Sequence, residues 1–278
     1  MELYTQSHPL SRRLHFINKF HSLNTGDHYG SVIDNIPLFL DYGLCIKHDI
    51  DKIIYKWIRE GDAVIIGGGG LLNNNKVKWN AKIFVLIEHC KKNNIKLFCV
   101  GAGMHKYKNI KEISRPINFD DFVLSGIRDY NFIDTDGRKI EYLPCTTCMS
   151  PLFDKRYDVV REFGVVQQHK NRIVDIDVNN YESIRTIGHI SQMLSFIGSC
   201  ETLLTNSYHA TLWAQLIGRR VILVNAWANK FDYMRHMPIR FSGNLTKDRE
   251  RSELYLDFLR ESRSIVNSFV QRILEHLE

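Results

Sequence analysis

A histidine stands at the start of a predicted helix in LLTNSYHATLWAQLIG. A buried strand is expected to end at Thr205, Asn206 and Ser207 offer side chains that can cap a helix, and His209 falls in the first helical turn. Free backbone N–H groups and the positive end of the helix dipole attract an anion there and lower the pKa of an imidazole. We therefore predict anion binding at Asn206 and Ser207 and acid–base chemistry at His209, the alternative being a capping or buried structural histidine.

Four consecutive glycines follow a predicted buried strand in DAVIIGGGGLLNNN. Glycine allows positive φ and brings backbone N–H groups close to a ligand, as in phosphate-binding loops. The spacing matches neither the dinucleotide fingerprint nor the P-loop. A tight turn packed closely between strand and helix would also need glycine, so ligand contact and packing both remain open. The candidate binding residues are Gly67, Gly68, Gly69 and Gly70.

Three further polar side chains stand in predicted turns or at strand ends. In LNTGDHYG, Asp27 is either a helix N-cap or a carboxylate that holds or deprotonates a hydroxyl. In LSGIRD, Arg128 suits bidentate capture of a phosphate or carboxylate, unless it is exposed or paired with the neighbouring Asp129. In VVQQHKN, His169 ends another predicted strand, although a lone histidine is more often structural than catalytic.

The six cysteines are scattered, and only Cys145 and Cys148 stand close together. A C-x-x-C pair without a second pair at metal-like spacing is weak evidence for a zinc site or a redox pair. We therefore expect two packed thiols and predict no metal. The cysteine distribution fits a reducing compartment, no window approaches the roughly 20 apolar residues of a membrane span, and the first residues lack a signal-peptide core, so we expect a cytoplasmic protein.

The elements that must position these residues alternate along the chain. Short apolar runs separated by longer amphipathic segments predict an α/β fold with parallel strands and with ligands at the strand carboxyl ends. Strands are expected over 63–67, 96–103, 121–126, 172–178, 202–206 and 220–225, and helices over 77–94, 181–200, 207–218 and 248–278.

Two prolines interrupt this alternation in EYLPCTTCMSPLFDKRYD, which indicates a domain boundary near residues 143–158. We predict two Rossmann-like domains that face a cleft, residues 1–150 and 151–250, followed by a C-terminal helix over 251–278. The composition, 44% hydrophobic and 24% charged, allows a sizeable core. The formal charge of +6 is mild and spread along the chain, so it does not indicate nucleic-acid binding, while it is compatible with anionic small molecules or a membrane surface.

Taken in order, several segments resemble the polysaccharide pyruvyl transferase family over residues 23–233. They are NTGD, AVIIGGGGLL, CVGAGM, SGIRD, a histidine-bearing strand in the second half, and TNSYHATLWAQLIGRRVILV. The resemblance implies a fold of the glycosyltransferase B type and transfer of a pyruvyl group from phosphoenolpyruvate to a saccharide or lipid-linked saccharide in surface polysaccharide biosynthesis. Many members carry an arginine two residues before the motif histidine, where this chain has Ser207.

With phosphoenolpyruvate as donor, the reaction requires a general acid, a base and anion-holding groups, but neither a redox cofactor nor a metal. His209 fits the acid and Asp27 the base, while Arg128, the amides near Gly68 and Gly69, and the helix start at Ser207 fit the anions. Two alternatives remain: a sugar-nucleotide-dependent glycosyltransferase of the same fold, and a non-catalytic sugar- or nucleotide-binding protein. The former shares nearly every feature, and Ser207 in place of arginine favours the latter.

Overall fold

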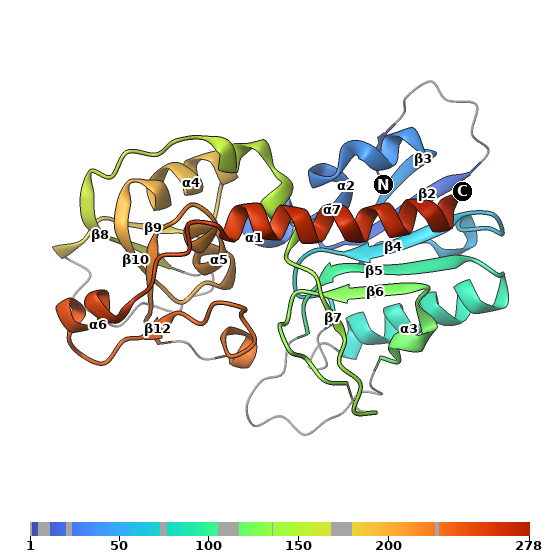
Figure 1. The fold of residues 1–278 in the computed structure, drawn as a ribbon. Coiled ribbons are helices and arrows are strands. Elements are labelled where there is room, and N and C mark those ends of the chain that lie inside the picture. Colours follow the sequence, from blue (N-terminus) through green and yellow to red (C-terminus); the bar gives the residue numbers. More distant parts are fainter. Residues whose placement is uncertain are drawn as a thin grey trace.

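A computed structural model describes residues 2–4, 12–20, 24–72, 77–104, 117–134, 136–167, 180–225 and 228–278. In this part of the chain the strands form two sheets that lie side by side, one from the first half of the sequence and one from the second (Figure 1). Neighbouring strands run parallel, except that β1 (Glu2–Tyr4) is antiparallel to β3 (Leu44–Asp49). The predicted α/β class is confirmed.

The first sheet has the order β1-β3-β2-β4-β5-β6-β7 within the described residues. Its strand β4 is buried along its whole length, as expected for a parallel strand covered on both faces. Helix α3 (Val77–Lys92) packs on one face, and the short α2 (Val32–Asn35) packs on the other. The remaining strands are β2 (Arg13–Asn18), β4 (Ala63–Gly67), β5 (Lys96–Ala102), β6 (Leu124–Ile127) and β7 (Glu141–Tyr142).

The second sheet has the order β12-β11-β10-β8-β9 in the described part of the chain. Its strands are β8 (Arg161–Gln167), β9 (Ser183–Arg185), β10 (Cys200–Thr205), β11 (Arg220–Leu223) and β12 (Ile239–Arg240), and its helices are α4 (Ile190–Gly198), α5 (Tyr208–Leu216) and α6 (Leu245–Arg251). Between the elements lie α1 (Thr25–Tyr29) and 3₁₀ turns: η1 (Pro37–Asp41), η2 (Tyr55–Trp57), η3 (Phe119–Asp121), η4 (Thr146–Met149), η5 (Pro151–Asp154) and η7 (Asn229–Phe231).

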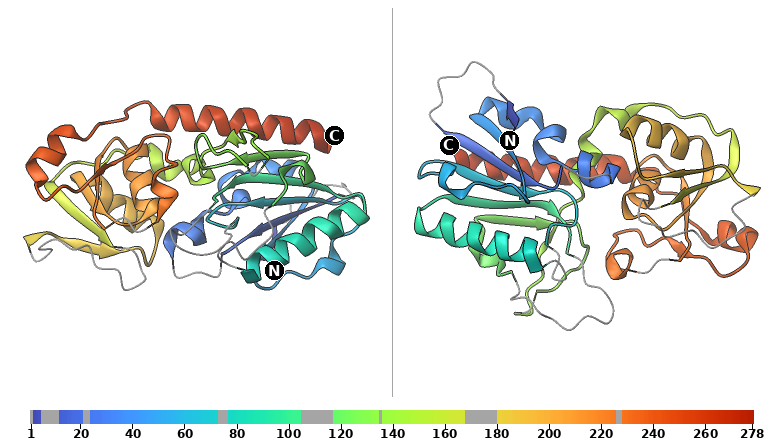
Figure 2. Two further views of the ribbon diagram at one scale, coloured as in Figure 1. Left: turned by 90° about the horizontal axis from the view of Figure 1, so that it is seen from below. Right: turned by 180° about the vertical axis from the view of Figure 1, so that it is seen from behind.

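Helix α7 (Phe258–Leu277) connects the two halves, because it leaves the second sheet and runs back across the first (Figures 1 and 2). Its apolar stripe, which includes Phe269 and Ile273, belongs to one core cluster with residues of both sheets. Hydrogen bonds between backbones also join the halves, from Thr25 N to Thr186 O at 3.1 Å and from Tyr130 N to Tyr233 O at 2.7 Å. The two sheets are therefore held together at several points.

Two predicted helices have the wrong extent, and in both cases tertiary contacts explain the difference. The single helix expected over 248–278 is two helices, because the buried carboxylate of Asp248 accepts hydrogen bonds from Ser242 and holds α6 near the second sheet while α7 packs on the first. The helix expected over 181–200 begins instead with β9, which pairs with β8, and becomes helical only after Gly188 with its φ of 109°. The strand expected over 172–178 lies outside the described residues.

The other predictions of elements hold more closely. Strand β4 has the predicted bounds. Strands β5 and β11 differ from the prediction by a few residues at one end, and β6 and β10 differ at both ends. Helix α3 ends near the Asn-Asn stop. Asn94 there takes a φ of 51°, the left-handed conformation that terminates helices. No described helix is long and apolar enough to cross a membrane.

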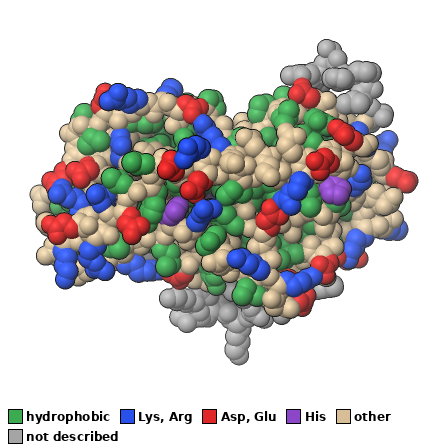
Figure 3. Space-filling model, viewed as in Figure 1, with side chains coloured by type: hydrophobic (Ala, Val, Ile, Leu, Met, Phe, Trp, Pro, Cys, Tyr) green, Lys and Arg blue, Asp and Glu red, His purple; other side chains and the backbone are tan. Residues whose placement is uncertain are grey.

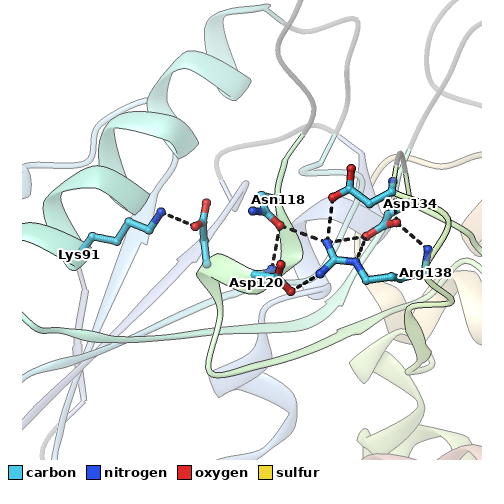
Figure 4. A network of polar contacts seen from close by, with 7 residues as sticks. Lys91, Asn118, Asp120, Asp134 and Arg138 are labelled. Atoms are coloured by element: carbon cyan, nitrogen blue, oxygen red, sulfur yellow. Dashed lines mark hydrogen bonds and ion pairs between the residues drawn. The ribbon is translucent and has the colours of Figure 1, made fainter.

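Charged side chains of both signs are interspersed over the face drawn in Figure 3. One exposed group is organised around Arg138, which bonds to Asp134, Asp136, Asp120 and Asn118, and Lys91 pairs with Asp121 beside it (Figure 4). These bonds tie η3 to the turn that precedes β7. Ion pairs that are exposed in this way contribute little to the free energy of unfolding.

Candidate functional site

Arg128 and His209 meet although they come from different sheets. Arg128 directly follows β6, and His209 lies in the first turn of α5, which follows β10. The Arg128 Nη1 donates a hydrogen bond to the His209 Nε2 at 3.3 Å, and the two residues are only 6% and 4% exposed. The site is therefore built where strand carboxyl ends of both halves approach each other, the location predicted for ligands in parallel α/β folds.

The guanidinium of Arg128 lies in a close-fitting space. The Arg128 backbone N–H donates a hydrogen bond to Ala102 O at 3.1 Å, and the Arg128 Cζ lies 4.1 Å from the centre of the Tyr208 ring. Gly103 leaves room for it, because a Cβ on Gly103 would be only 2.3 Å from the Arg128 Nε. That Nε has no hydrogen-bond partner among the described residues, although buried charged groups are ordinarily satisfied.

The alternatives considered for Arg128, exposure or pairing with Asp129, do not describe this side chain. Arg128 is buried, and the Asp129 carboxylate instead accepts a hydrogen bond from the Met104 N–H at 2.7 Å. No ion pair joins Arg128 and Asp129 within the described part of the chain. Burial raises the pKa of the Asp129 carboxyl to about 7, although the nearby charges of Arg128 and Lys230 and the Met104 N–H lower it. Asp129 is thus able to hold a proton near neutral pH.

His209 is not a helix cap. Ser207 is the cap of α5, and its Oγ accepts from Ala210 N at 3.5 Å. The imidazole packs closely against Gly26, where a Cβ would be 2.0 Å from the His209 Nδ1, and its Nε2 lies 3.9 Å from the Cys145 Sγ. The imidazole is therefore held from both sides.

Burial lowers the pKa of His209 well below its usual value, and the positive charges of Arg128 and Lys230 lower it further. The predicted direction of the shift is confirmed, but its causes are burial and these two cations. The imidazole is neutral near pH 7, which agrees with its Nε2 accepting the Arg128 hydrogen bond.

The first two glycines of the run are needed for packing. A Cβ on Gly67 would lie 2.4 Å from Val100 O, and one on Gly68 would lie 1.6 Å from Gly30 O. Gly68 also has a φ of 74°, which favours glycine. At these two positions the structure supports the packing interpretation.

The last two glycines face the candidate site. A Cβ on Gly69, whose φ is 67°, would be 3.1 Å from an Asp27 carboxylate oxygen, and one on Gly70 would be 3.6 Å from the Arg128 Nη2. These glycines therefore lie next to the carboxylate and the guanidinium that the sequence singled out. The run divides into a packing pair and a pair beside the site.

Asp27 is half-buried in α1, whose cap is Asn24 and not Asp27. The Asn24 Oδ1 accepts from Gly26 N at 3.1 Å, and the Asn24 Nδ2 donates to Asp27 at 3.3 Å. The capping interpretation of Asp27 is therefore wrong, and its carboxylate lies beside Gly69. Among the other predicted residues, Asn206 and Ser207 are buried at the α5 start, while His169 lies outside the described residues.

Three side chains near the site were not singled out from the sequence. The Tyr208 ring stacks on the Arg128 guanidinium, and Asp129 is the residue after Arg128 in the chain. The ammonium of Lys230 lies 5.8 Å from the Tyr208 ring centre. The position of Asp129 at a strand end was a usable signal. Tyr208 and Lys230 carried none, because only the packing of the two halves brings them to Arg128.

Cys145 and Cys148 are buried free thiols in and beside η4. Burial raises the pKa of the Cys148 thiol, which makes it unreactive. The Thr147 hydroxyl donates to the Cys145 Sγ at 3.5 Å and accepts from the Trp213 Nε1 at 3.2 Å. Thr147 thereby links η4 to α5 beside the two buried thiols. The described residues contain no cluster of three or more histidine, cysteine or acidic side chains arranged to hold a metal ion.

A family model described as "Polysaccharide pyruvyl transferase" matches residues 25–225. A solved structure of an uncharacterized protein from Klebsiella pneumoniae is similar at 14% sequence identity and a TM-score of 0.49, over 84% of this chain and 93% of that one. No curated protein matches the chain.

Proposed function

Since the chain belongs to the polysaccharide pyruvyl transferase family, we propose that it transfers a pyruvyl group from phosphoenolpyruvate to a saccharide and closes it there as a ketal. The observation that carries this proposal is the buried Arg128 guanidinium, with an unused Nε donor and with His209 against its Nη1. A buried cation beside a titratable group is suited to an anionic donor that must also be protonated.

The reaction has defined requirements. A proton adds to the methylene carbon, and the oxygen of one sugar hydroxyl bonds to the adjacent carbon. Phosphate then leaves with its bridging oxygen as the second hydroxyl bonds to the same carbon. Both hydroxyl protons are released, and the products are the ketal and inorganic phosphate.

We propose that His209 is the general acid that protonates the methylene carbon of phosphoenolpyruvate. Burial and the two cations lower its pKa, so it is neutral near pH 7, but a bound anion offsets those cations and raises the pKa. His209 would take up a proton as the donor binds and then deliver it. Asp129 is a second proton carrier beside Arg128, since its pKa is raised to about 7.

We assign activation of the sugar hydroxyls to Asp27, which is half-buried and adjacent to Gly69. Arg128, the backbone around Gly69 and Gly70, and the α5 start at Asn206 and Ser207 would hold the anionic groups of the donor. Gly67 and Gly68 support this loop by packing. His169 stays a proposed binding residue.

The wider setting is also a proposal. We propose that residues 1–150 and 151–250 are the two Rossmann-like domains of a glycosyltransferase B type fold, with a C-terminal helix over 251–278. The two parallel sheets, joined by α7, support this architecture. We further propose a cytoplasmic protein of surface polysaccharide biosynthesis, which meets a saccharide or lipid-linked saccharide acceptor at the membrane surface.

Calorimetric titration of the purified protein with phosphoenolpyruvate tests the donor. We expect binding, and we expect Arg128→Ala to weaken it by about 1.5 to 3 kcal/mol, the range for a charged hydrogen bond. Arg272→Ala is the control, because that partly exposed arginine pairs with Glu141 and packs on Phe269 of α7. If the wild-type protein binds a sugar nucleotide but not phosphoenolpyruvate, the pyruvyl-transfer proposal is wrong and a glycosyltransferase activity takes its place.

A second measurement tests the transfer itself. Phosphate should be released from phosphoenolpyruvate only when a suitable saccharide is supplied, without added metal or nucleotide. Release without any saccharide would indicate hydrolysis and contradict the transferase assignment.

A further inference from the structure

Lys230 brings a second cation to the Arg128 site from the other half of the molecule. It lies on η7, after the second sheet's β11, and its Nζ is 5.8 Å from the centre of the Tyr208 ring. The Arg128 guanidinium lies 4.1 Å from the same ring. Two positive groups from different halves therefore lie against one aromatic side chain.

The position of Lys230 is set by its buried neighbours. Phe231 is almost fully buried, its ring centre lies 6.3 Å from that of Tyr208, and the Lys230 Nζ lies 5.3 Å from it. A hydrogen bond from Asp232 N to Asn229 O at 2.9 Å closes the turn. The backbone of Lys230 is thereby anchored, while the side chain itself is half-buried.

The charge of Lys230 acts on both titratable groups of the site. After burial and Arg128, it is the next cause that lowers the pKa of His209, and it also lowers the pKa of Asp129. A bound anion near Tyr208 would be attracted by both positive charges, that of Arg128 and that of Lys230.

We propose that Lys230 is a second anion-binding residue, which holds the phosphate of the donor while Arg128 holds its carboxylate. This inference rests on the proposed function. The planar guanidinium, buried beside Gly103, matches a planar carboxylate, whereas an ammonium is a compact charge suited to phosphate. The half-buried Lys230 also lies nearer solvent than Arg128, as suits a group that must release inorganic phosphate after each transfer.

Lys230→Gln tests the assignment by calorimetry with three probes: phosphoenolpyruvate, inorganic phosphate and pyruvate. We expect affinity for phosphoenolpyruvate and for phosphate to fall about 10-fold or more, with pyruvate binding unchanged. Arg128→Ala should have the opposite effect: pyruvate binding should be lost, while phosphate binding should be retained. Lys230→Arg should restore part of the phosphate affinity. Lys247→Gln is the matched control, because it removes an exposed lysine from the same half of the chain.

The pKa of His209, followed by NMR, gives a readout that needs no ligand. Removing the Lys230 charge should raise that pKa in Lys230→Gln, and Lys247→Gln should leave it unchanged. If the wild type binds phosphoenolpyruvate and Lys230→Gln binds it and phosphate equally well, the inference is wrong while the proposed function stands. If the wild type does not bind phosphoenolpyruvate, both are wrong.

Discussion

Among single side chains, the informative ones are charged groups whose burial is not explained by an ordinary ion pair. Arg128 is buried with an unsatisfied Nε, and it contacts a neutral imidazole instead of a carboxylate. Burial lowers the pKa of Arg128, but nearby groups that include Asp129 and Asp27 raise it above its usual value, so the guanidinium stays charged in the site. A site that must bind an anion gains from this arrangement, because the unused Nε donor is available to the ligand.

His209→Gln is expected to keep the fold and remove most turnover. The amide can still accept the Arg128 hydrogen bond but cannot deliver a proton, and general acid–base groups contribute about 10²- to 10⁴-fold. Phosphate release with a competent acceptor measures the effect, and His276→Gln, at an exposed position, is the control. Wild-type turnover in His209→Gln would reduce His209 to a structural partner of Arg128.

Gly103→Ala should weaken donor binding indirectly, by displacing the Arg128 guanidinium. A methyl group there would lie 2.3 Å from the Arg128 Nε and 2.8 Å from its Cζ, so the guanidinium must move. We expect affinity for phosphoenolpyruvate to approach that of Arg128→Ala. Gly137→Ala is the comparison for binding alone. No atom lies within 4 Å of an added Cβ there, so binding should be unaffected, while its φ of 81° makes alanine unfavourable for stability.

Among helices and strands, the loop after β4 combines two functions in four residues. Gly68 allows the connection between α1 and α2 to pack against this loop, because Gly30 O occupies the space that a Cβ on residue 68 would need. The φ of Gly68 is 74°, which also favours glycine. Gly70 has no such constraint and lies beside Arg128. Strand–loop packing and ligand contact are therefore separable by mutation.

Gly68→Ala is expected to destabilise the protein by more than about 1 kcal/mol, the typical cost of an unsuitable backbone conformation before any clash is added. Gly70→Ala should change the unfolding free energy by less than about 0.5 kcal/mol and should instead alter donor affinity. Urea denaturation and calorimetry on both variants separate the two effects. Equal losses of stability would show that the entire run serves packing.

For the molecule as a whole, α7 is the element that packs with residues of both sheets. Its apolar stripe belongs to the same buried cluster as Phe16 of the first sheet and Leu203 of the second. The site depends on this connection, because Arg128 and His209 come from opposite halves. We therefore expect a single unfolding transition.

Phe269→Ala is expected to lower the unfolding free energy by about 3 to 5 kcal/mol, as for other buried phenylalanines. The entire transition should shift, since the helix packs with residues of both halves. Leu256→Ala, at a position 80% exposed, should have little effect. Two separated transitions in a thermal scan of either variant would contradict this view of α7.

The sequence by itself determined the α/β class, the bounds of β4, the helix stop at Asn94 and the likeness to the family, because these depend on local periodicity, turn residues and motif order. It also identified Arg128 and His209 as separate candidates. Only the tertiary structure decided that the two are in contact, that Asn24 and not Asp27 caps α1, and that Lys230 joins them. The pairing of β9 and the break before α7 were likewise decided by contacts between residues far apart in the chain, which no local pattern records.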